Sequence, residues 1–278
     1  MKVLVTGGTG HLGRAVVADL RASGHRVRVL ARRPGEDPAI EWRRGDLATG
    51  EGVAAAVSGV EAIVHAATHS PAAQRGGLRP RDFLGSPTDV DIEGTKILLG
   101  AAEDAALEHF VHVSIVGLRH MARLPYSRVK LAAEELVQSS TVPWSIVRAT
   151  GFYWLLDRML TRIARRPPVV LPAEVRMQPV ASDEFATFVV ESLSDGRRGE
   201  REDFAGPEQL TLPELAEQHL AARGLRRRIW NPPVPRRIQA TVTAGSTSPK
   251  ARLGATTWME WLRRTYDQPA TPTRASRC

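Results

Sequence analysis

Short runs of β-branched and aliphatic residues alternate with longer amphipathic or alanine-rich stretches over the first 150 residues. Short apolar runs predict buried strands, and the stretches between them predict helices. Repeated strand–helix–strand units form a parallel sheet with helices on its faces. We therefore expect an α/β fold, a doubly wound parallel sheet with six strands at 2–6, 26–31, 40–44, 62–66, 109–116 and 144–148.

The first helix is predicted directly after the first strand, over residues 12–23. Leu12, Val16 and Leu20 follow a four-residue spacing, which places them on one face of a helix. Gly24 supplies the signal that ends it. The first unit is therefore strand, glycine turn, helix, strand.

The regular alternation ends near Thr150. Helices are still predicted at 154–165, from Asp183 onward and after Thr211, because threonine can cap a helix. The last residues are rich in Pro, Thr, Arg and Ser, which predicts disorder. We expect three parts: a sheet domain over 1–150, a small mixed lobe over 151–265 that packs on it, and a disordered tail over 266–278.

Composition narrows the class of protein only slightly. The 278 residues are 42% hydrophobic and 24% charged, as in ordinary globular proteins. The single cysteine, Cys278, forms no intramolecular disulfide, and we expect a cytoplasmic protein. No apolar run reaches the roughly 20 residues that cross a bilayer. The formal charge is +8, and the basic residues are mostly arginines, which are spread along the chain and densest at 226–228. They form no recognisable nucleic-acid module, so we predict no nucleic-acid or membrane partner.

The connection 68–87 is long and rich in Gly, Pro and Arg. It follows the fourth strand, where the ligand crevice of such sheets lies. Loops of this length inside a compact domain are usually functional or disordered. We expect it to form a mobile rim of the site.

A glycine-rich turn follows the first strand at once. Its residues are Thr6, Gly7, Gly8, Thr9, Gly10, His11, Leu12 and Gly13, which contain the pattern G-x-G-x-x-G. Glycines allow the tight turn, the close approach of backbone to a pyrophosphate and the packing of helix on sheet. Backbone N–H groups at the helix start then bind phosphates. The segment predicts dinucleotide binding by a Rossmann fold.

The end of the second strand indicates which dinucleotide is bound. An NAD enzyme places an acidic residue about 20 residues after the glycines, where it binds the ribose 2′-hydroxyl. In this chain Arg32 and Arg33 follow the strand, and Glu36 and Asp37 arrive only after a Pro-Gly pair. Arginine pairs with a 2′-phosphate and stacks on adenine. We therefore predict NADP(H).

These residues, with those below, resemble the short-chain dehydrogenase/reductase superfamily, specifically its atypical branch related to NmrA-like and isoflavone-reductase-like proteins, over roughly residues 1–220. The resemblance implies cofactor contacts after the third, fourth and sixth strands. They are Asp46 and Leu47 beside the adenine, Ala66, Ala67 and Thr68 beneath the cofactor, and Ala149, Thr150 and Gly151 at the nicotinamide end.

The strongest catalytic signal is the pair Tyr126 and Lys130, which fits the Tyr-x-x-x-Lys signature. With three tyrosines and four lysines in the chain, chance seldom produces this spacing. On a helix the two side chains share one face, so the ammonium can favour the phenolate form of the tyrosine. Tyr126 would then protonate a carbonyl oxygen during hydride transfer. The resemblance gives Lys130 a second role as a ligand of the ribose hydroxyls.

The resemblance adds two further catalytic residues. Ser114 lies near the end of a strand similar to the one that carries the family's serine, and it would hydrogen-bond the substrate oxygen. Asp91 stands where the family normally has an asparagine, either as a polar anchor or as a helix cap. Three aromatic residues after the sixth strand either line an apolar substrate pocket or pack in the core: Phe152, Tyr153 and Trp154.

The sequence therefore predicts an NADPH-dependent oxidoreductase that transfers hydride to a carbonyl, quinone or other conjugated small molecule. Two alternatives stay open. One is a non-catalytic NADP-binding redox sensor of the NmrA type, with the 226–237 region as a partner surface. The other is an NAD(P)-dependent epimerase or dehydratase, which calls for a larger lobe. The histidine pairs lack a third ligand, so we predict no metal, and we expect a monomer or homodimer.

Overall fold

The computed structural model describes residues 1–77, 82, 84–196 and 198–267. All six predicted strands are present, and each end lies within one residue of its predicted position. They are β1 (Lys2–Thr6), β2 (Arg26–Ala31), β3 (Glu41–Arg44), β4 (Ala62–His65), β5 (His109–Ile115) and β6 (Trp144–Ala149). Three short strands from the second half of the chain join the same sheet: β9 (Gly199–Glu200), β10 (Phe204–Ala205) and β13 (Arg252–Leu253).

The sheet has the spatial order β13-β10-β6-β5-β4-β1-β2-β3, with β9 paired to β6. Every pairing described in it is parallel. The order 3-2-1-4-5-6 of the first six strands is that of a doubly wound Rossmann sheet, so the predicted fold class is confirmed. The central strand β4 is buried throughout, as its continuous apolar run requires, whereas β3 lies at the edge and is partly exposed.

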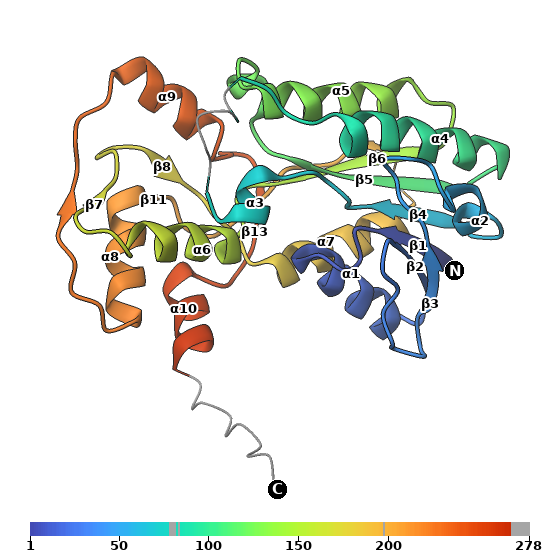
Figure 1. The fold of residues 1–278 in the computed structure, drawn as a ribbon, viewed down its shortest axis with the longest axis horizontal. Coiled ribbons are helices and arrows are strands. Elements are labelled where there is room, and N and C mark those ends of the chain that lie inside the picture. The colour runs from blue at the N-terminus through green and yellow to red at the C-terminus, as the bar shows by residue number, and fades with distance from the viewer. Residues whose placement is uncertain (78–81, 83, 197, 268–278) are drawn as a thin grey trace, which may run out of the picture.

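Helices cover both faces of the sheet (Figure 1). On one face lie α1 (His11–Ala22) and α7 (Ser182–Ser194), which form a core with β1, β2 and β6. On the other face lie α2 (Val53–Val57), α4 (Gly94–Asp104) and α5 (Pro125–Ser139), which form a second core with Phe110 of β5 and Ile146 of β6. The carboxyl ends of the parallel strands therefore meet at one edge between these layers, where the site described below is built.

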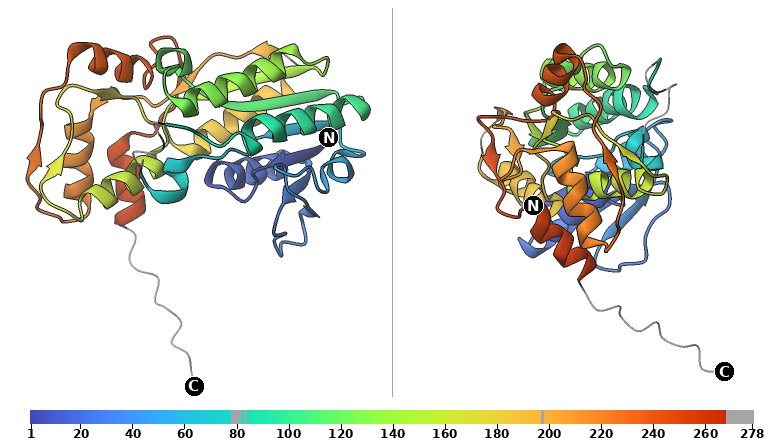
Figure 2. Two further views of the ribbon diagram at one scale, coloured as in Figure 1. Left: turned by 45° about the horizontal axis from the view of Figure 1, so that its top comes forward. Right: turned by 90° about the vertical axis from the view of Figure 1, so that its left-hand side faces the viewer.

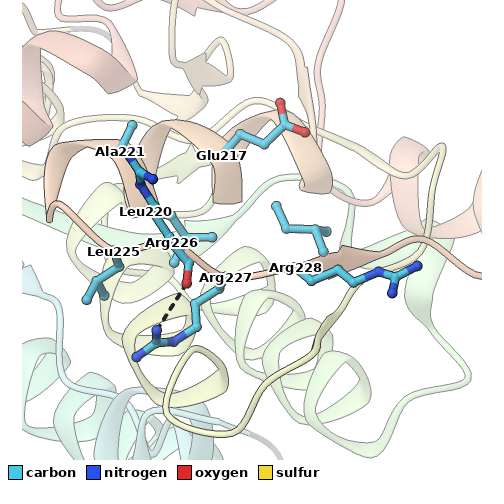
Figure 3. Close-up of a pocket in the computed structure, with 8 residues that line it drawn as sticks. Glu217, Leu220, Ala221, Leu225, Arg226, Arg227 and Arg228 are labelled. Carbon is cyan, nitrogen blue, oxygen red and sulfur yellow. Dashed lines mark hydrogen bonds between the residues drawn. The ribbon is translucent and has the colours of Figure 1, made fainter.

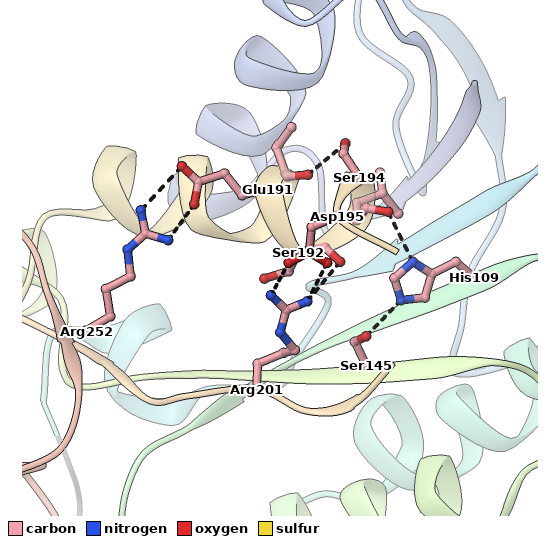
Figure 4. Close-up of polar contacts among 10 residues, drawn as sticks. His109, Ser145, Glu191, Ser192, Ser194, Asp195, Arg201 and Arg252 are labelled. Carbon is pink, nitrogen blue, oxygen red and sulfur yellow. Dashed lines mark hydrogen bonds and ion pairs between the residues drawn. The ribbon is translucent and has the colours of Figure 1, made fainter. Parts of the chain in front are cut away.

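The helix α7 returns to the sheet from the second half of the chain. It packs along α1, where the Thr187 hydroxyl donates a hydrogen bond of 2.8 Å to Asp19. Its end is tied to the strands by His109, whose Nδ1 donates to the Leu193 carbonyl while Nε2 lies 2.8 Å from Ser145 Oγ (Figure 4). The sheet layer thus includes chain segments well beyond residue 150.

The C-terminal lobe contains α6 (Tyr153–Ile163), α8 (Leu212–Ala222), α9 (Arg236–Ala244) and α10 (Trp258–Tyr266). Two small sheets complete it: β7 (Val169–Val170) with β12 (Ile229–Trp230), and β8 (Arg176–Met177) with β11 (Leu210–Thr211). The lobe has its own apolar core, with Trp258 fully buried at its centre. Thr211 caps α8 in a capping box with Glu214, as predicted for a helix after this threonine.

The predicted tail begins at the end of α10. Tyr266 is the last residue of that helix, and its hydroxyl donates a hydrogen bond of 2.5 Å to Asp157. Residues 268–278, with Cys278, lie outside the described residues. Part of the connection 68–87 also lies outside them, but its described part contains the short helix α3 (Pro71–Arg75). Within the described residues, no helix combines the length and apolar composition that a membrane span needs.

Candidate cofactor and active site

The glycine turn joins β1 to α1. Gly7 has φ +73°, and a Cβ atom there would lie 2.7 Å from the backbone of Ala66 and Ala67 at the end of β4. A Cβ atom on Gly13 would lie 2.0 Å from the carbonyl oxygen of Gly7. The turn closes this tightly only with glycine at both positions.

The start of α1 is suited to an anionic group. Its N-cap residue is Gly10, and among the described residues no side chain caps the helix and no acidic residue occupies its first turn. Backbone N–H groups at such a helix start lack intrahelical partners and favour negative charge. The residues present therefore fit the pyrophosphate of a dinucleotide.

A cavity of about 590 Å³ lies beside this turn. It is lined by Thr9, Ala31, Arg32 and Arg33. Asp37 is the second acidic residue after β2. Its carboxylate forms an ion pair with Arg21 at 2.9 Å and accepts a hydrogen bond from the Ala39 N–H. The described lining of the cavity thus presents two guanidinium groups and no carboxylate.

A chain of hydrogen bonds fixes the ends of β1 and β4 relative to each other. Thr95 Oγ1 donates to the carbonyl oxygen of Asp91 at 2.7 Å, so it accepts from Nε2 of His65 at 2.9 Å. Nδ1 of His65 then accepts from the Thr6 hydroxyl at 2.6 Å. Burial, with a smaller effect of the Lys130 ammonium, lowers the pKa of His65 to about 3. His65 is therefore a neutral, structural imidazole.

Asp91 and Lys130 form a buried ion pair. Asp91 lies in a π-helical turn, η2 (Asp89–Glu93), and its side chain is 1% exposed. Its carboxylate accepts from Thr68 Oγ1 at 2.8 Å, the His69 N–H at 2.8 Å and Lys130 Nζ at 3.2 Å. Burial alone would raise the pKa of Asp91, but the Lys130 ammonium and the hydrogen-bond donors outweigh it and hold this pKa below its ordinary value.

Tyr126 and Ser114 lie at the same edge of the sheet. Tyr126 is the second residue of α5, one turn before Lys130, and its hydroxyl lies 3.5 Å from Thr68 Oγ1. Ser114 is buried near the carboxyl end of β5, and its Oγ has no hydrogen-bond partner among the described residues. A buried hydroxyl without a partner is costly unless a ligand supplies one. Thr68 lies within hydrogen-bond distance of both Tyr126 and Asp91, so it links Tyr126 to the Asp91–Lys130 pair.

The helix that carries Tyr126 is anchored by a pair of residues that the sequence analysis missed. Arg148 on β6 donates to both oxygens of Glu134 on α5, at 2.9 and 2.7 Å. Burial lowers the pKa of Arg148, but the two carboxylates, Glu134 and Glu200, outweigh it and raise this pKa. Because such bidentate pairs are geometrically specific, this pair fixes α5 on the sheet. Arginine and glutamate are common surface residues, so the sequence offered no signal for it.

Several predicted cofactor contacts are positioned by the surrounding backbone. Asp46 follows β3 and accepts from the Ala48 N–H at 3.0 Å in a local turn. Leu47 and Ala149 are core residues. Thr150 donates from its hydroxyl to the Gln178 carbonyl at 2.5 Å, which ties the end of β6 to the lobe. Gly151 accepts from the Val180 N–H at 2.8 Å.

The three aromatic residues after β6 have different environments, and Tyr153 is the one that lies deepest in the lobe. It is 1% exposed, its hydroxyl donates to the Thr256 carbonyl at 2.8 Å, and its ring packs against Trp258. Phe152 is partly buried against Phe185. Tyr153 therefore packs in the core of the lobe, which is the second of the two environments expected for these aromatic residues.

Trp154 makes a contact that the sequence did not predict. Its ring stacks on His11 of the glycine turn, with centroids 4.1 Å apart and planes within 9°. Burial lowers the pKa of His11, and the charges of Arg14 and Arg158 lower it further. The stack joins the lobe directly to the dinucleotide turn.

No group of three or more possible ligands for a metal occurs among the described residues.

The fold and site define a class of protein. A doubly wound parallel sheet carries a helix with Tyr126 and Lys130 one turn apart at its carboxyl edge, as the resemblance noted in the sequence analysis implies. Residues 7–195 match the family model described as NAD(P)H-binding. The chain therefore belongs to the NAD(P)H-binding family.

Two curated relatives show different roles. The chain is 28% identical over 200 residues to the photosystem II assembly factor Ycf39 of Trieres chinensis, covering 69% of this chain and 60% of the relative. It is 29% identical over 236 residues to the divinyl chlorophyllide a 8-vinyl-reductase of Oryza sativa subsp. indica, covering 76% and 56%. The chain thus spans a little over half the length of these relatives.

Solved structures share the fold at low identity. A short-chain dehydrogenase/reductase superfamily protein of Agrobacterium tumefaciens with bound NAD has a TM-score of 0.73 and 22% identity, with 96% of each chain covered. The NADPH-dependent quinone oxidoreductase of Escherichia coli in complex with NADPH has a TM-score of 0.70 and 15% identity, with 95% of this chain and 99% of that chain covered. One neighbour holds NAD and the other NADPH, which agrees with an NAD(P)H-binding fold.

Proposed function

We propose that the protein is an NADPH-dependent reductase that transfers a hydride to a carbonyl, quinone or other conjugated small molecule. The observation that carries the proposal is the chain of contacts from Tyr126 through Thr68 to the Asp91–Lys130 pair, at the carboxyl edge of the sheet beside the glycine turn. When bound, the nicotinamide cofactor supplies the hydride.

The side chains at this edge donate the proton, hydrogen-bond the substrate oxygen and position the lysine. Tyr126 donates its hydroxyl proton to the substrate oxygen. The Ser114 hydroxyl, which has no partner among the described residues, donates a hydrogen bond to the same oxygen. Asp91 holds the Lys130 ammonium in place, one helical turn from Tyr126. Lys130 also holds the ribose hydroxyls.

The cofactor preference rests on the cavity beside the glycine turn. Arg32 and Arg33 line it and would bind the 2′-phosphate of NADPH. In the double variant Arg32→Ala/Arg33→Ala we expect NADPH to bind at least about tenfold more weakly, while NADH binding stays unchanged. Arg26→Ala, at the opposite end of the same strand, is the matched control. Equal losses for both cofactors would contradict the assignment.

A second candidate function is a non-catalytic NADP-binding regulator of the NmrA type. The similarity to an assembly factor favours it, because that name describes a role other than turnover. Under this function the tyrosine–lysine pair serves only to hold the ribose.

One experiment separates the two functions. NADPH and NADH are titrated by fluorescence, and NADPH oxidation is then followed against a panel of ketones and quinones. We expect turnover that is lost in Tyr126→Phe and kept in Tyr266→Phe, a control in the lobe. Binding without turnover on any panel member would favour the regulator. Absence of NADPH binding would refute both.

A further inference from the structure

The net charge of the protein comes from one segment. From Gln218 to Met259 the chain has no Asp or Glu but eight Arg or Lys residues. The rest of the chain carries 30 basic and 30 acidic residues, so it is formally neutral. The charge of +8 is therefore concentrated in the C-terminal lobe rather than spread over the molecule.

Six of these basic residues lie between the end of α8 and the start of α9. They are Arg223, Arg226, Arg227, Arg228, Arg236 and Arg237. This segment runs along the left edge of Figure 1, at the end of the molecule opposite the N-terminus, and the right-hand view of Figure 2 looks onto it. We call this surface, residues 223–237, the arginine end. It contains no lysine.

Most of these charges have no counter-ion. Among the described residues, Arg226, Arg228, Arg236 and Arg237 form no ion pair with a carboxylate, and Arg227 donates only to backbone carbonyl oxygens. Such a cluster repels itself and attracts an anionic partner.

A groove with an apolar floor runs along the arginine end (Figure 3). Its volume is about 590 Å³. It lies between α8 and residues 225–229, with four apolar lining residues and four charged ones: Leu220, Ala221, Leu225, Ile229, Glu217, Arg226, Arg227 and Arg228. In Figure 3 the side chains of Arg227 and Arg228 extend to opposite sides. They do not converge on one small anion but can contact separate charges of an extended partner.

Exposed apolar side chains lie beside the groove. Trp230 is 59% exposed and Val170 is 45% exposed, and the two residues are paired in register on β12 and β7. Arginine and tryptophan are enriched at protein interfaces, and lysine is depleted there. Polybasic surfaces that bind bilayers use lysine and arginine alike. A flat bilayer also leaves a concave groove unfilled, and binding of single-stranded nucleic acid relies on several stacked aromatic residues.

We propose that the arginine end docks a partner protein through an acidic segment whose apolar side chains occupy the groove. The carboxylates of that segment pair with Arg226 and Arg228, and its apolar side chains rest on Leu220 and Leu225. This surface lies on the lobe, away from the glycine turn, so docking is independent of the proposed reductase activity.

The test uses the full-length protein and two short fluorescein-labelled peptides, one alternating Glu with Leu and one alternating Glu with Ser. Fluorescence anisotropy is measured at low and high salt. We expect the Glu-Leu peptide to bind more tightly than the Glu-Ser peptide, and both to weaken as salt is raised. Arg226→Glu/Arg228→Glu should weaken binding of the Glu-Leu peptide at least about tenfold, and Trp230→Ala about threefold.

Controls separate docking from misfolding and from general charge. Arg26→Glu/Lys96→Glu makes the same change of charge on exposed residues outside the lobe and should leave peptide binding intact. The midpoint of thermal unfolding reports folding, and Arg226→Gln/Arg228→Gln replaces the charge reversal if that variant is unstable. Unchanged peptide binding in these variants would overturn the proposal. So would binding to phosphatidylglycerol vesicles or to oligo-dT that is as tight as peptide binding and is lost in the same variants.

Discussion

Replacing Asp91 by asparagine removes the negative charge that faces the buried ammonium of Lys130 while it nearly preserves the size of the side chain. The Nζ–Oδ1 distance is 3.2 Å, and both side chains are at most 3% exposed. At an effective dielectric constant of about 20, two unit charges at this distance attract each other by about 5 kcal/mol. Part of this attraction offsets the cost of burying both groups.

The carboxylate also accepts two other hydrogen bonds, from Thr68 and His69, on its two oxygens. An amide has one acceptor oxygen, so one donor must then face an NH₂ group. Breaking a buried pair by removing one partner typically costs about 3–5 kcal/mol. We expect Asp91→Asn to lower the free energy of unfolding by about 3 kcal/mol at pH 7, or roughly 6–12 °C in the unfolding midpoint.

The effect should depend on pH in a defined direction. The pKa of Asp91 is lowered in the folded protein, so its contribution to stability is present above the unfolded value near pH 4 and is lost as pH falls through the folded pKa. Urea unfolding from pH 8 to pH 3 should therefore show a constant difference between the two proteins down to about pH 5, which shrinks below about pH 4. Asp89→Asn, an exposed change in the same turn, is the control. A difference under about 1 kcal/mol at pH 7, or one that does not shrink in acid, would refute the reasoning.

Three further substitutions test the glycine turn, the buried part of β5 and the stack between α6 and the turn. Gly13→Ala places a methyl group 2.0 Å from the Gly7 carbonyl oxygen, so we expect at least about tenfold weaker NADPH binding by fluorescence, and unchanged affinity would mean that the turn relaxes. His112→Phe replaces a buried imidazole whose two nitrogens have no partner among the described residues, so urea unfolding should show a gain of about 1 kcal/mol, whereas loss of turnover would reveal a chemical role. Trp154→Ala removes the ring that covers one face of His11, so the pKa of His11 should rise toward its ordinary value in an NMR titration, and an unchanged pKa would show that the stack does not cause the shift.

Local signals explain which parts of the structure the sequence predicts. The six strands follow from their apolar runs, and the glycine turn follows from spacing within eight residues. Tyr126 and Lys130 lie one turn apart on a single helix, so their common placement needs no knowledge of the rest of the fold.

The features that were missed depend on contacts between distant segments. Tyr153 and Trp154 are neighbours in α6, yet one is in the lobe core and the other stacks on the glycine turn. Successive residues of a helix point in different directions, and only the position of the lobe decides which faces inward. The two-residue strands β10 and β13 likewise exist only because the sheet offers them an edge.

Because α7 packs on α1, the core over α1 cannot be complete until α7 has been synthesised. Helix α1 and the turn before it leave the ribosome early, but α7 is complete only after residue 194. Until then the apolar residues Phe185, Phe188 and Val189, which complete the core over α1, are missing. Contacts of such long sequence separation cost loop-closure entropy and slow folding. A chain stopped at residue 150 therefore carries every glycine of the dinucleotide turn without the helix that completes the core over α1.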